Sequence, residues 1–241
     1  MTTVVLIRHG RTAANTAGIL VGRTSGVELD EVGREQAAAV GLRLAAVPLH
    51  AIVTSPLRRC RQTAQAILSA NQGDPVVAVE QGLVECGYGE WTGKSMRELS
   101  KDRLWQSVQH QPSAVRFPGG ESMSEMSGRA VSAIRSWDRQ LAADRGEEAV
   151  WAAVSHGDLI KAILADALGM HLDSFQRILV DPAAVSVVRY TALRPYVITV
   201  NSSGSDLSGL FHASSRRPRQ ARRQVRSPAV GGGLGASDLL G

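Results

Sequence analysis

The 241-residue chain has few aromatic residues and few cysteines. Phe, Trp and Tyr together make up 4% of it, which argues against a stacking surface for single-stranded nucleic acid. Its two cysteines, Cys60 and Cys86, cannot build a disulfide framework, and no Cys/His cluster has the spacing of a zinc site. No apolar run approaches membrane-spanning length, and the first residues do not have the pattern of a secretory signal. We therefore expect a cytoplasmic protein without membrane association.

The formal net charge of +5 is unevenly distributed along the chain. From residue 202 onward, six arginines face two aspartates, so this segment carries +4 and residues 1–201 only +1. Ser, Gly, Arg and Pro dominate the segment and hydrophobic periodicity disappears, which predicts a disordered tail. We divide the chain into a folded domain, 1–201, and a tail, 202–241. The tail leaves open a role in binding a partner or nucleic acid, although without interleaved aromatics it supports only nonspecific attraction.

Short apolar runs alternate with segments of helical periodicity between residues 4 and 200. The alternation predicts an α/β protein, a three-layer α/β/α sandwich around a mostly parallel sheet. The last strands follow one another too closely for crossovers, so they should add an antiparallel edge. Strands are expected at 4–7, 50–55, 75–79, 149–155, 177–180, 185–190 and 196–200. Helices are expected at 30–46, 56–70, 96–108, 122–143 and from 158 through 168, and loops at 15–28 and 82–93.

Reactive side chains follow three of the predicted strands. The first strand ends in Arg8 and His9, the strand over 149–155 ends in His156, and the strand over 50–55 runs into a helix that begins with several arginines. The carboxyl ends of parallel strands share one rim, where α/β proteins bind ligands. Two imidazoles and at least two guanidiniums at that rim suit a dianion, because guanidinium matches phosphate oxygens. Glu85, on a glycine-rich loop, can reach the same rim. The combination favours phosphoryl transfer.

An ordered set of motifs makes the chain resemble the histidine phosphatase superfamily, branch 1, the phosphoglycerate mutase-like group. The matching pieces occur in the family's order over residues 4 to about 200, and the tail lies outside the match. They are 8–12 with Asn15, 29–37, 55–57 with Arg59 and 62–64, Glu85 with 88–89 and 91–93, 118–122, and 155–157.

The resemblance implies a phosphoglycerate mutase-like fold and a reaction without metal or cofactor. His9 would be the nucleophile that carries the phosphoryl group as phosphohistidine, and Glu85 would act as general acid and base. His9 must be neutral to attack, whereas His156 could stay cationic against the bound phosphate. Catalytic or binding contacts to the substrate would come from Arg8, Asn15, Gly22, Arg59, His156 and Gly157. The family pattern selects Arg59 over the neighbouring arginines, and Glu90 is a rival of Glu85.

The family contains phosphatases and mutases, which differ in what covers the common core. Its mutases carry an insertion with paired arginines and several prolines, which clamps a carboxylate and excludes water. Residues 95–118 contain three separate arginines and no such stretch. We therefore favour a phosphatase acting on a small phosphorylated metabolite, with a phosphoglycerate-mutase-type phosphomutase as the alternative and a homo-oligomer as possible. The resemblance does not determine the contacts to the rest of the substrate, because Val21, Ser25 and Asp158 depart from the family pattern.

Overall fold

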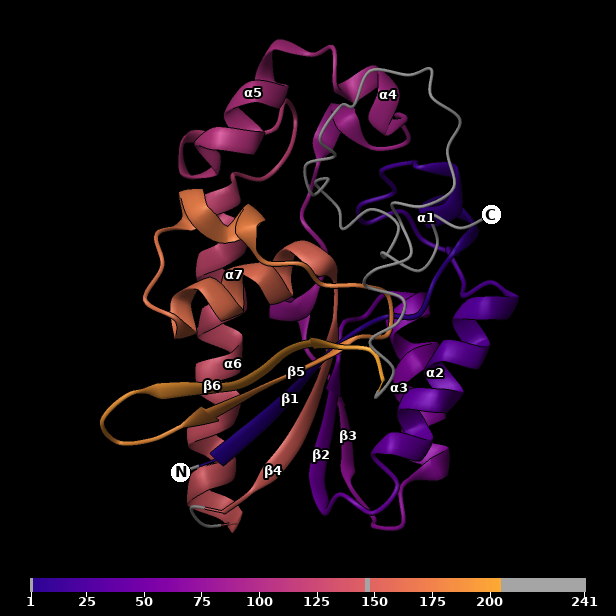
Figure 1. Cartoon of the computed structure of the whole chain (residues 1–241), viewed down its shortest axis with the longest axis vertical. Helices are drawn as coiled ribbons and strands as arrows, with labels where there is room; N and C mark the ends of the chain where they lie inside the picture. The colour runs from indigo at the N-terminus through magenta and orange to yellow at the C-terminus, as the bar shows by residue number, and fades with distance from the viewer. Residues whose placement is uncertain (1, 146–147, 205–241) are drawn as a thin grey trace, which may run out of the picture.

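The computed structural model describes residues 2–145 and 148–204, with a six-stranded sheet at its centre (Figure 1). The strand order is β3-β2-β4-β1-β5-β6. The first four strands are parallel, and β5 and β6 are antiparallel to their neighbours. The prediction of a mostly parallel sheet with an antiparallel edge is confirmed. The strands are β1 (Thr2–Arg8), β2 (Leu49–Thr54), β3 (Val76–Val79), β4 (Val150–Ser155), β5 (Val185–Tyr190) and β6 (Pro195–Ser202).

The central strand β1 is buried on both faces, as its uninterrupted apolar run predicts. Val4 and Leu6 point to one face of the sheet and belong to one core cluster. Val5 and Ile7 alternate with them and belong to the other. The two-residue period of a strand thus divides one short run between two cores. This placement holds the residues that follow Ile7 in the middle of the sheet.

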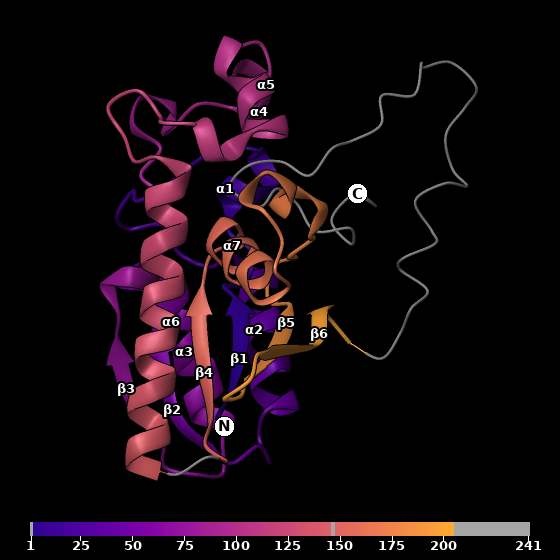
Figure 2. The same cartoon turned by 90° about the vertical axis from the view of Figure 1, so that its left-hand side faces the viewer.

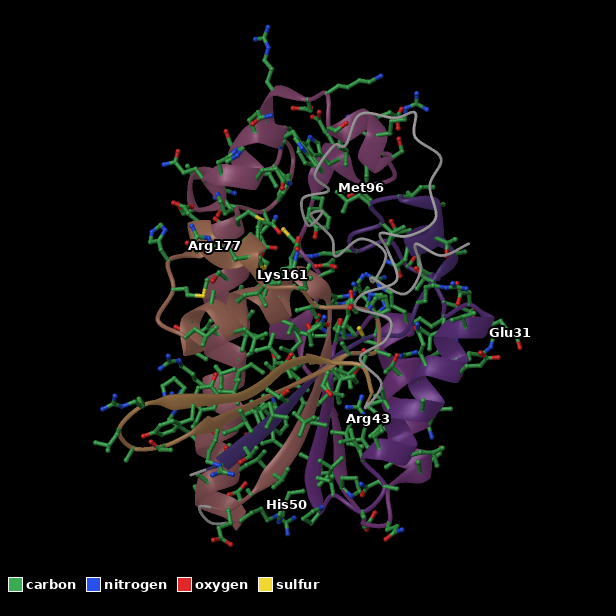
Figure 3. All side chains as sticks on the ribbon, in the orientation of Figure 1. Glu31, Arg43, His50, Met96, Lys161 and Arg177 are labelled. Carbon is green, nitrogen blue, oxygen red and sulfur yellow. The ribbon has the colours of Figure 1, made fainter. Side chains whose placement is uncertain are left out.

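Helices cover the two faces of the sheet (Figures 1 and 2). Side chains of α2 and α3 fill the core on one face, and those of α6 and α7 fill the other. Asp30 caps α2 by accepting the backbone N–H of Gly33 at 2.7 Å, at the start of the helix expected at 30–46, while Glu31 lies on the outer surface (Figure 3). The three-layer arrangement is confirmed. The helices are α1 (Ala13–Ala17), α2 (Glu31–Arg43), α3 (Arg58–Ala70), α4 (Met96–Leu99), α5 (Arg103–His110), α6 (Met123–Arg145) and α7 (Gly157–Ala167).

The carboxyl ends of β1, β2 and β4 form one rim of the sheet. Arg8 of β1 lies opposite Ser155 of β4, and Thr54 of β2 lies opposite Val154. The chain therefore leaves these three strands at the same level and carries the next side chains into one region. The segment with α4 and α5 lies beyond this rim, at the top of Figure 1.

Three predicted elements differ from the structure. The first residues of the loop expected at 15–28 belong to helix α1, Ala13–Ala17, because Thr12 and Asn15 form a reciprocal capping box. The helix expected at 96–108 is two helices, since Asp102 caps α5 by accepting the N–H of Leu104. The strand expected at 177–180 is wrong. A 3₁₀ helix, Leu172–Arg177, occupies its start, and the carbonyl of Val180 accepts a hydrogen bond from the side chain of Arg8 instead of a strand partner.

The predicted tail lies outside the described residues from residue 205 onward, and β6 ends at Ser202. In the part of the chain that is described, no helix is long and apolar enough to cross a membrane.

Candidate active site

His9 lies directly after β1, and its hydrogen bonds define its tautomer. It is 3% exposed, and its Nδ1 lies 2.7 Å from the carbonyl oxygen of Gly10. A carbonyl only accepts, so Nδ1 carries the proton and Nε2 carries the lone pair. Arg59 Nε donates to Nε2 at 3.2 Å. Burial, with the charges of Arg59 and Arg8, holds the pKa of His9 well below 6.5. His9 is therefore neutral, with Nε2 as its nucleophilic atom.

His156 follows β4 and lies against His9, with the ring centroids 5.2 Å apart and the ring planes inclined at 63°. Its Nε2 is 2.8 Å from Ser55 Oγ, and Arg59 Nη2 lies 3.3 Å from its Nδ1. Since Arg can only donate, Nδ1 accepts and Nε2–H donates to the serine. Burial and the charge of Arg59 hold the pKa of His156 well below 6.5. In the structure His156 is therefore neutral, and the cationic form expected against a bound phosphate stays a prediction.

Arg59 connects the two imidazoles from the first turn of α3. Its side chain is 1% exposed, and its Nη2 also donates to the carbonyl of Gly22 at 2.8 Å. Within residues 2–145 and 148–204, Nη1 is buried without a hydrogen-bond partner. A buried guanidinium nitrogen without an acceptor is costly, and an anion at this point would supply one. The neighbouring Arg58 is exposed and paired with Glu28 at 3.0 Å, as expected for a surface charge.

Arg8 is buried beside this cluster, with 1% of its surface exposed. Its Nη1 donates to the carbonyl of Val180 at 2.8 Å. Burial lowers its pKa, although the nearby carboxylate of Glu85 opposes the shift. Its charge contributes to the low pKa of His9. Arg8 is thus close enough to act electrostatically on the site, while the predicted contact to a phosphoryl oxygen stays untested.

Glu85 is brought to the same place by the 3₁₀ turn Gln81–Leu83, which precedes it. It is 3% exposed, accepts the N–H of Cys86 at 2.9 Å and has an oxygen 3.7 Å from His156 Nδ1. Burial, followed by repulsion from Asp158, raises the pKa of Glu85 to about 7. A carboxyl with this pKa can give and take a proton near neutrality. The rival Glu90 is exposed and does not line the pocket.

Asp158 forms a buried polar network behind Glu85. Tyr88 Oη donates to its Oδ2 at 2.8 Å, and Lys161 Nζ lies 3.6 Å from its Oδ1. Lys161, in the interior in Figure 3, also donates to Gln176 at 3.1 Å. In the sequence Asp158 is visible only as a departure from the family pattern. Its link to Tyr88 spans 70 residues, and local periodicity carries no signal for such a contact.

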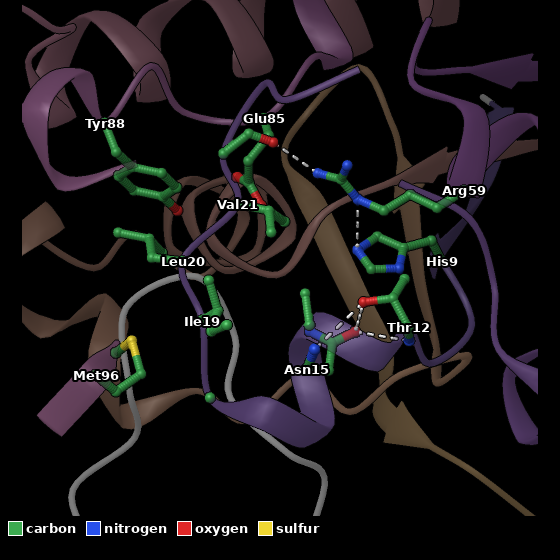
Figure 4. A pocket seen from close by; sticks show the side chains of 13 residues that line it. His9, Thr12, Asn15, Ile19, Leu20, Val21, Arg59, Glu85, Tyr88 and Met96 are labelled. Atoms are coloured by element: carbon green, nitrogen blue, oxygen red, sulfur yellow. Dashed lines mark hydrogen bonds between the residues drawn. The ribbon is translucent and has the colours of Figure 1, made fainter. Parts of the chain in front are cut away.

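A pocket opens at His9, Arg59 and Glu85, whereas Arg8 and His156 lie outside its lining (Figure 4). Asn15 lines it, with its Oδ1 accepting the backbone N–H of Thr12 in the capping box. Gly22 lines it with φ at 49°, and a Cβ there would come within 3.0 Å of the Tyr88 ring. Gly157 is the first residue of α7, a helix start without a side-chain cap, which suits an anion. The lining residues are His9, Thr12, Ala14, Asn15, Gly18, Ile19, Leu20, Val21, Gly22, Arg59, Glu85, Tyr88 and Met96.

Other motif residues brace the backbone around His9. The N–H of Gly10 donates to Thr63 Oγ1 at 3.1 Å, and the N–H of Arg11 donates to Gln36 Oε1 at 2.9 Å. A Cβ on Gly10 would overlap the carbonyl of Gly33 in α2. The absence of a side chain at Gly10 therefore lets the turn pack closely on this helix.

The two cysteines behave as packing residues. Cys60 and Cys86 are both fully buried and free of disulfides. Burial raises the pKa of the Cys60 thiol to about 12 and raises that of Cys86 as well. Neither thiol is ionised at neutral pH. Across the described residues, no three His, Cys, Asp or Glu side chains cluster as metal ligands.

Comparisons with known proteins agree on one family. The family model described as histidine phosphatase superfamily (branch 1) matches residues 4–203. A glucosyl-3-phosphoglycerate phosphatase from Mycolicibacterium vanbaalenii is 31% identical over 175 residues, or 71% of this chain and 76% of that protein. A 2,3-bisphosphoglycerate-dependent phosphoglycerate mutase 2 from Gloeobacter violaceus is 31% identical over 169 residues, or 69% and 75%. A mutant phosphoserine phosphatase from Entamoeba histolytica, solved with phosphoserine, superposes with a TM-score of 0.74 at 25% identity and covers 84% of this chain and 98% of that one.

Proposed function

The chain belongs to the histidine phosphatase superfamily, branch 1, and is a phosphoric monoester hydrolase; we propose that it works through a phosphohistidine formed on His9. The observation that carries the proposal is the arrangement around Arg59. One buried guanidinium donates to the imidazoles of both His9 and His156 and keeps a third nitrogen, Nη1, without an acceptor among the residues described. A phosphoryl dianion would satisfy that nitrogen and lie beside the lone pair of His9.

The first step transfers the phosphoryl group to the enzyme. Nε2 of His9 attacks phosphorus in line with the ester oxygen, the N–P bond forms and the P–O bond to the alcohol breaks. Glu85, protonated, gives its proton to the departing alkoxide oxygen. Arg59, Arg8 and His156 hold the phosphoryl oxygens, and Asn15, Gly22 and the amide of Gly157 complete the binding site. Arg59 gives up its hydrogen bond to Nε2 as it binds the dianion.

The second step releases phosphate. Glu85, now a carboxylate, takes a proton from a water molecule whose oxygen attacks phosphorus. The N–P bond breaks, inorganic phosphate leaves and His9 regains its neutral Nδ1–H form. The carbonyl of Gly10 keeps that proton on Nδ1 throughout, so the same nitrogen is available for each turnover.

The composition of residues 95–118 favours hydrolysis over transfer of the phosphoryl group to a second hydroxyl. A mutase needs cations that hold the carboxylate of its substrate and exclude water. Arg97, Arg103 and Arg116 of this segment are all exposed, and none of them lines the pocket. A phosphomutase remains the alternative, as one relative of this chain is a phosphoglycerate mutase. The binding role of the basic tail, the cytoplasmic location and a homo-oligomer remain predictions.

Turnover of p-nitrophenyl phosphate tests the proposal. The full-length protein should hydrolyse it, His9→Ala should abolish turnover, and EDTA should leave the rate unchanged. Adding 2,3-bisphosphoglycerate with a phosphoglycerate separates the alternative, because a mutase would interconvert phosphoglycerates faster than it releases phosphate. Turnover that survives His9→Ala or requires a metal would contradict the mechanism.

A further inference from the structure

The pocket has a polar half and an apolar half (Figure 4). His9, Thr12, Asn15 and Arg59 gather on one side in the close-up, while Ile19, Leu20, Tyr88 and Met96 lie on the other. The phosphoryl group belongs to the polar half, where the guanidinium and the imidazole are. The alcohol part of the ester must then extend along the other half.

The apolar half offers almost no polar atom to a substrate. Leu20 is 4% exposed and Ile19 is 39% exposed, so Leu20 lies deep in the apolar half and Ile19 lies at its edge. Tyr88 has one polar group, and its hydroxyl already donates to Asp158 at 2.8 Å. Its ring therefore contributes carbon to the pocket, as do Val21 and Met96.

Lys94 and Arg97, which flank Met96, are exposed and do not line the pocket, and the two arginines that flank Ile19, Leu20 and Val21 are held by acids. Arg11 Nε lies 2.8 Å from Asp30 Oδ2. Arg23 donates to the carbonyl of Glu85 and forms a 2.8 Å ion pair with Glu121. Among the residues that line the pocket in the described part of the chain, Arg59 is the one permanent cation, and the phosphoryl group uses it. A carboxylate on the alcohol would therefore lose water without gaining a counterion.

We propose that the substrate is a phosphomonoester of an uncharged alcohol that is apolar next to the ester oxygen, and that Ile19, Leu20, Val21, Tyr88 and Met96 select it. The proposal rests on the proposed phosphatase function. The proposal specifies the alcohol that leaves, which the mechanism of phosphoryl transfer does not specify. A phosphorylated hydroxy acid would reach the same catalytic residues, but its carboxylate would then lie against the apolar side chains of the pocket.

A matched pair of substrates isolates the charge. 3-Phosphonooxypropanoate and its methyl ester have the same primary ester oxygen and differ in one carboxylate. We expect kcat/KM of the full-length protein to be at least tenfold higher for the methyl ester. In an alkyl phosphate series from ethyl to hexyl, kcat/KM should rise by up to about fourfold for each methylene that the pocket covers.

Matched variants locate the selection. Ile19→Arg places a cation at the edge of the apolar half and should lower the preference for the methyl ester at least fivefold by raising kcat/KM for the carboxylate. Ile198→Arg adds the same charge at an exposed position of β6 outside the pocket lining and should leave the preference unchanged. Equal or faster hydrolysis of the carboxylate by the wild type would overturn the proposal, as would the same change in both variants.

Hydrolysis of p-nitrophenyl phosphate distinguishes this failure from failure of the proposed function. If the wild type turns over the aryl ester but prefers the carboxylate substrate, the substrate class is wrong and the phosphatase mechanism stands. If it turns over none of these esters, both are overturned.

Discussion

Replacing Asp158 by Asn tests how the protein sets the pKa of Glu85. The substitution keeps the size of the side chain and an acceptor for Tyr88 Oη, and it removes one buried negative charge. The pKa of Glu85 is about 7 because burial raises it first and the charge of Asp158 on α7 raises it further. Arg59 on α3 and Arg8 on β1 act in the opposite direction. His156 and His9, at the ends of their strands, are neutral in the structure.

The sign of the effect follows from the role of Glu85 in the first step. As general acid it must be protonated, so kcat/KM of the wild type should fall as the pH rises through about 7. Without the charge of Asp158 the carboxyl ionises more easily, so this fall should move to lower pH. Since burial remains, the pKa in the variant should stay above the ordinary 4.5. Loss of a nearby like charge is worth about one pKa unit, so kcat/KM above pH 7 should drop about tenfold.

The assay is kcat/KM for a fixed alkyl phosphate between pH 4.5 and 9, so that ionisation of the substrate is common to all variants. Tyr88→Phe removes the hydrogen bond to Asp158 without changing the charge of Asp158, and it should leave the alkaline limb in place. Lys161 can tolerate the change because burial already lowers its pKa, and it keeps Gln176 as an acceptor. A limb that does not move in Asp158→Asn, or that moves to higher pH, would refute the electrostatic argument.

Three further substitutions, two of them with a matched control, test the phosphate site, the proton donor and the packing of α2. Arg59→Lys keeps the charge but loses the planar fork, so kcat/KM should fall about 10²-fold or more in steady-state assays, whereas Arg58→Ala should change it less than about twofold. Glu85→Gln should slow alkyl phosphates far more than p-nitrophenyl phosphate, because only a poor leaving group needs its proton; an equal loss for both would remove the acid role. Gly33→Ala should lower the free energy of unfolding by about 2–4 kcal/mol in denaturant titrations, since its Cβ would overlap the carbonyl of Arg11, whereas Gly128→Ala, with open space around it, should raise it by about 1 kcal/mol.

The convergence of His9, His156 and Arg59 could be predicted from the sequence. Each follows an apolar run that is recognisable as a strand, and the carboxyl ends of parallel strands meet at one rim. The start of α2 was equally accessible, because Asp30 is a local signal for an N-cap. What the motif resemblance added was the choice of Arg59 among adjacent arginines. The structure gives the physical counterpart of that choice, since Arg59 is buried and Arg58 is exposed.

Contacts between distant segments could not be predicted in this way. The bond from Tyr88 to Asp158 and the close approach of Gly10 to Gly33 depend on how helices lie on the sheet, which no local pattern encodes. The break between α4 and α5 was missed because Asp102 competes for the backbone inside a segment of otherwise helical periodicity. Two of these residues act on the site directly, since Asp158 raises the pKa of Glu85 and Tyr88 lines the pocket.

The most direct test of the central claim is the identity of the phosphorylated residue. Rapid quenching of the protein with a ³²P-labelled phosphomonoester should trap a label that is stable in alkali and lost in acid, and peptide mapping should place it on His9. The label should be absent from His9→Ala and should accumulate to no more than one phosphoryl group per chain. A label on another residue, or steady-state hydrolysis with no trapped phosphoenzyme and full activity in His9→Ala, would contradict the account.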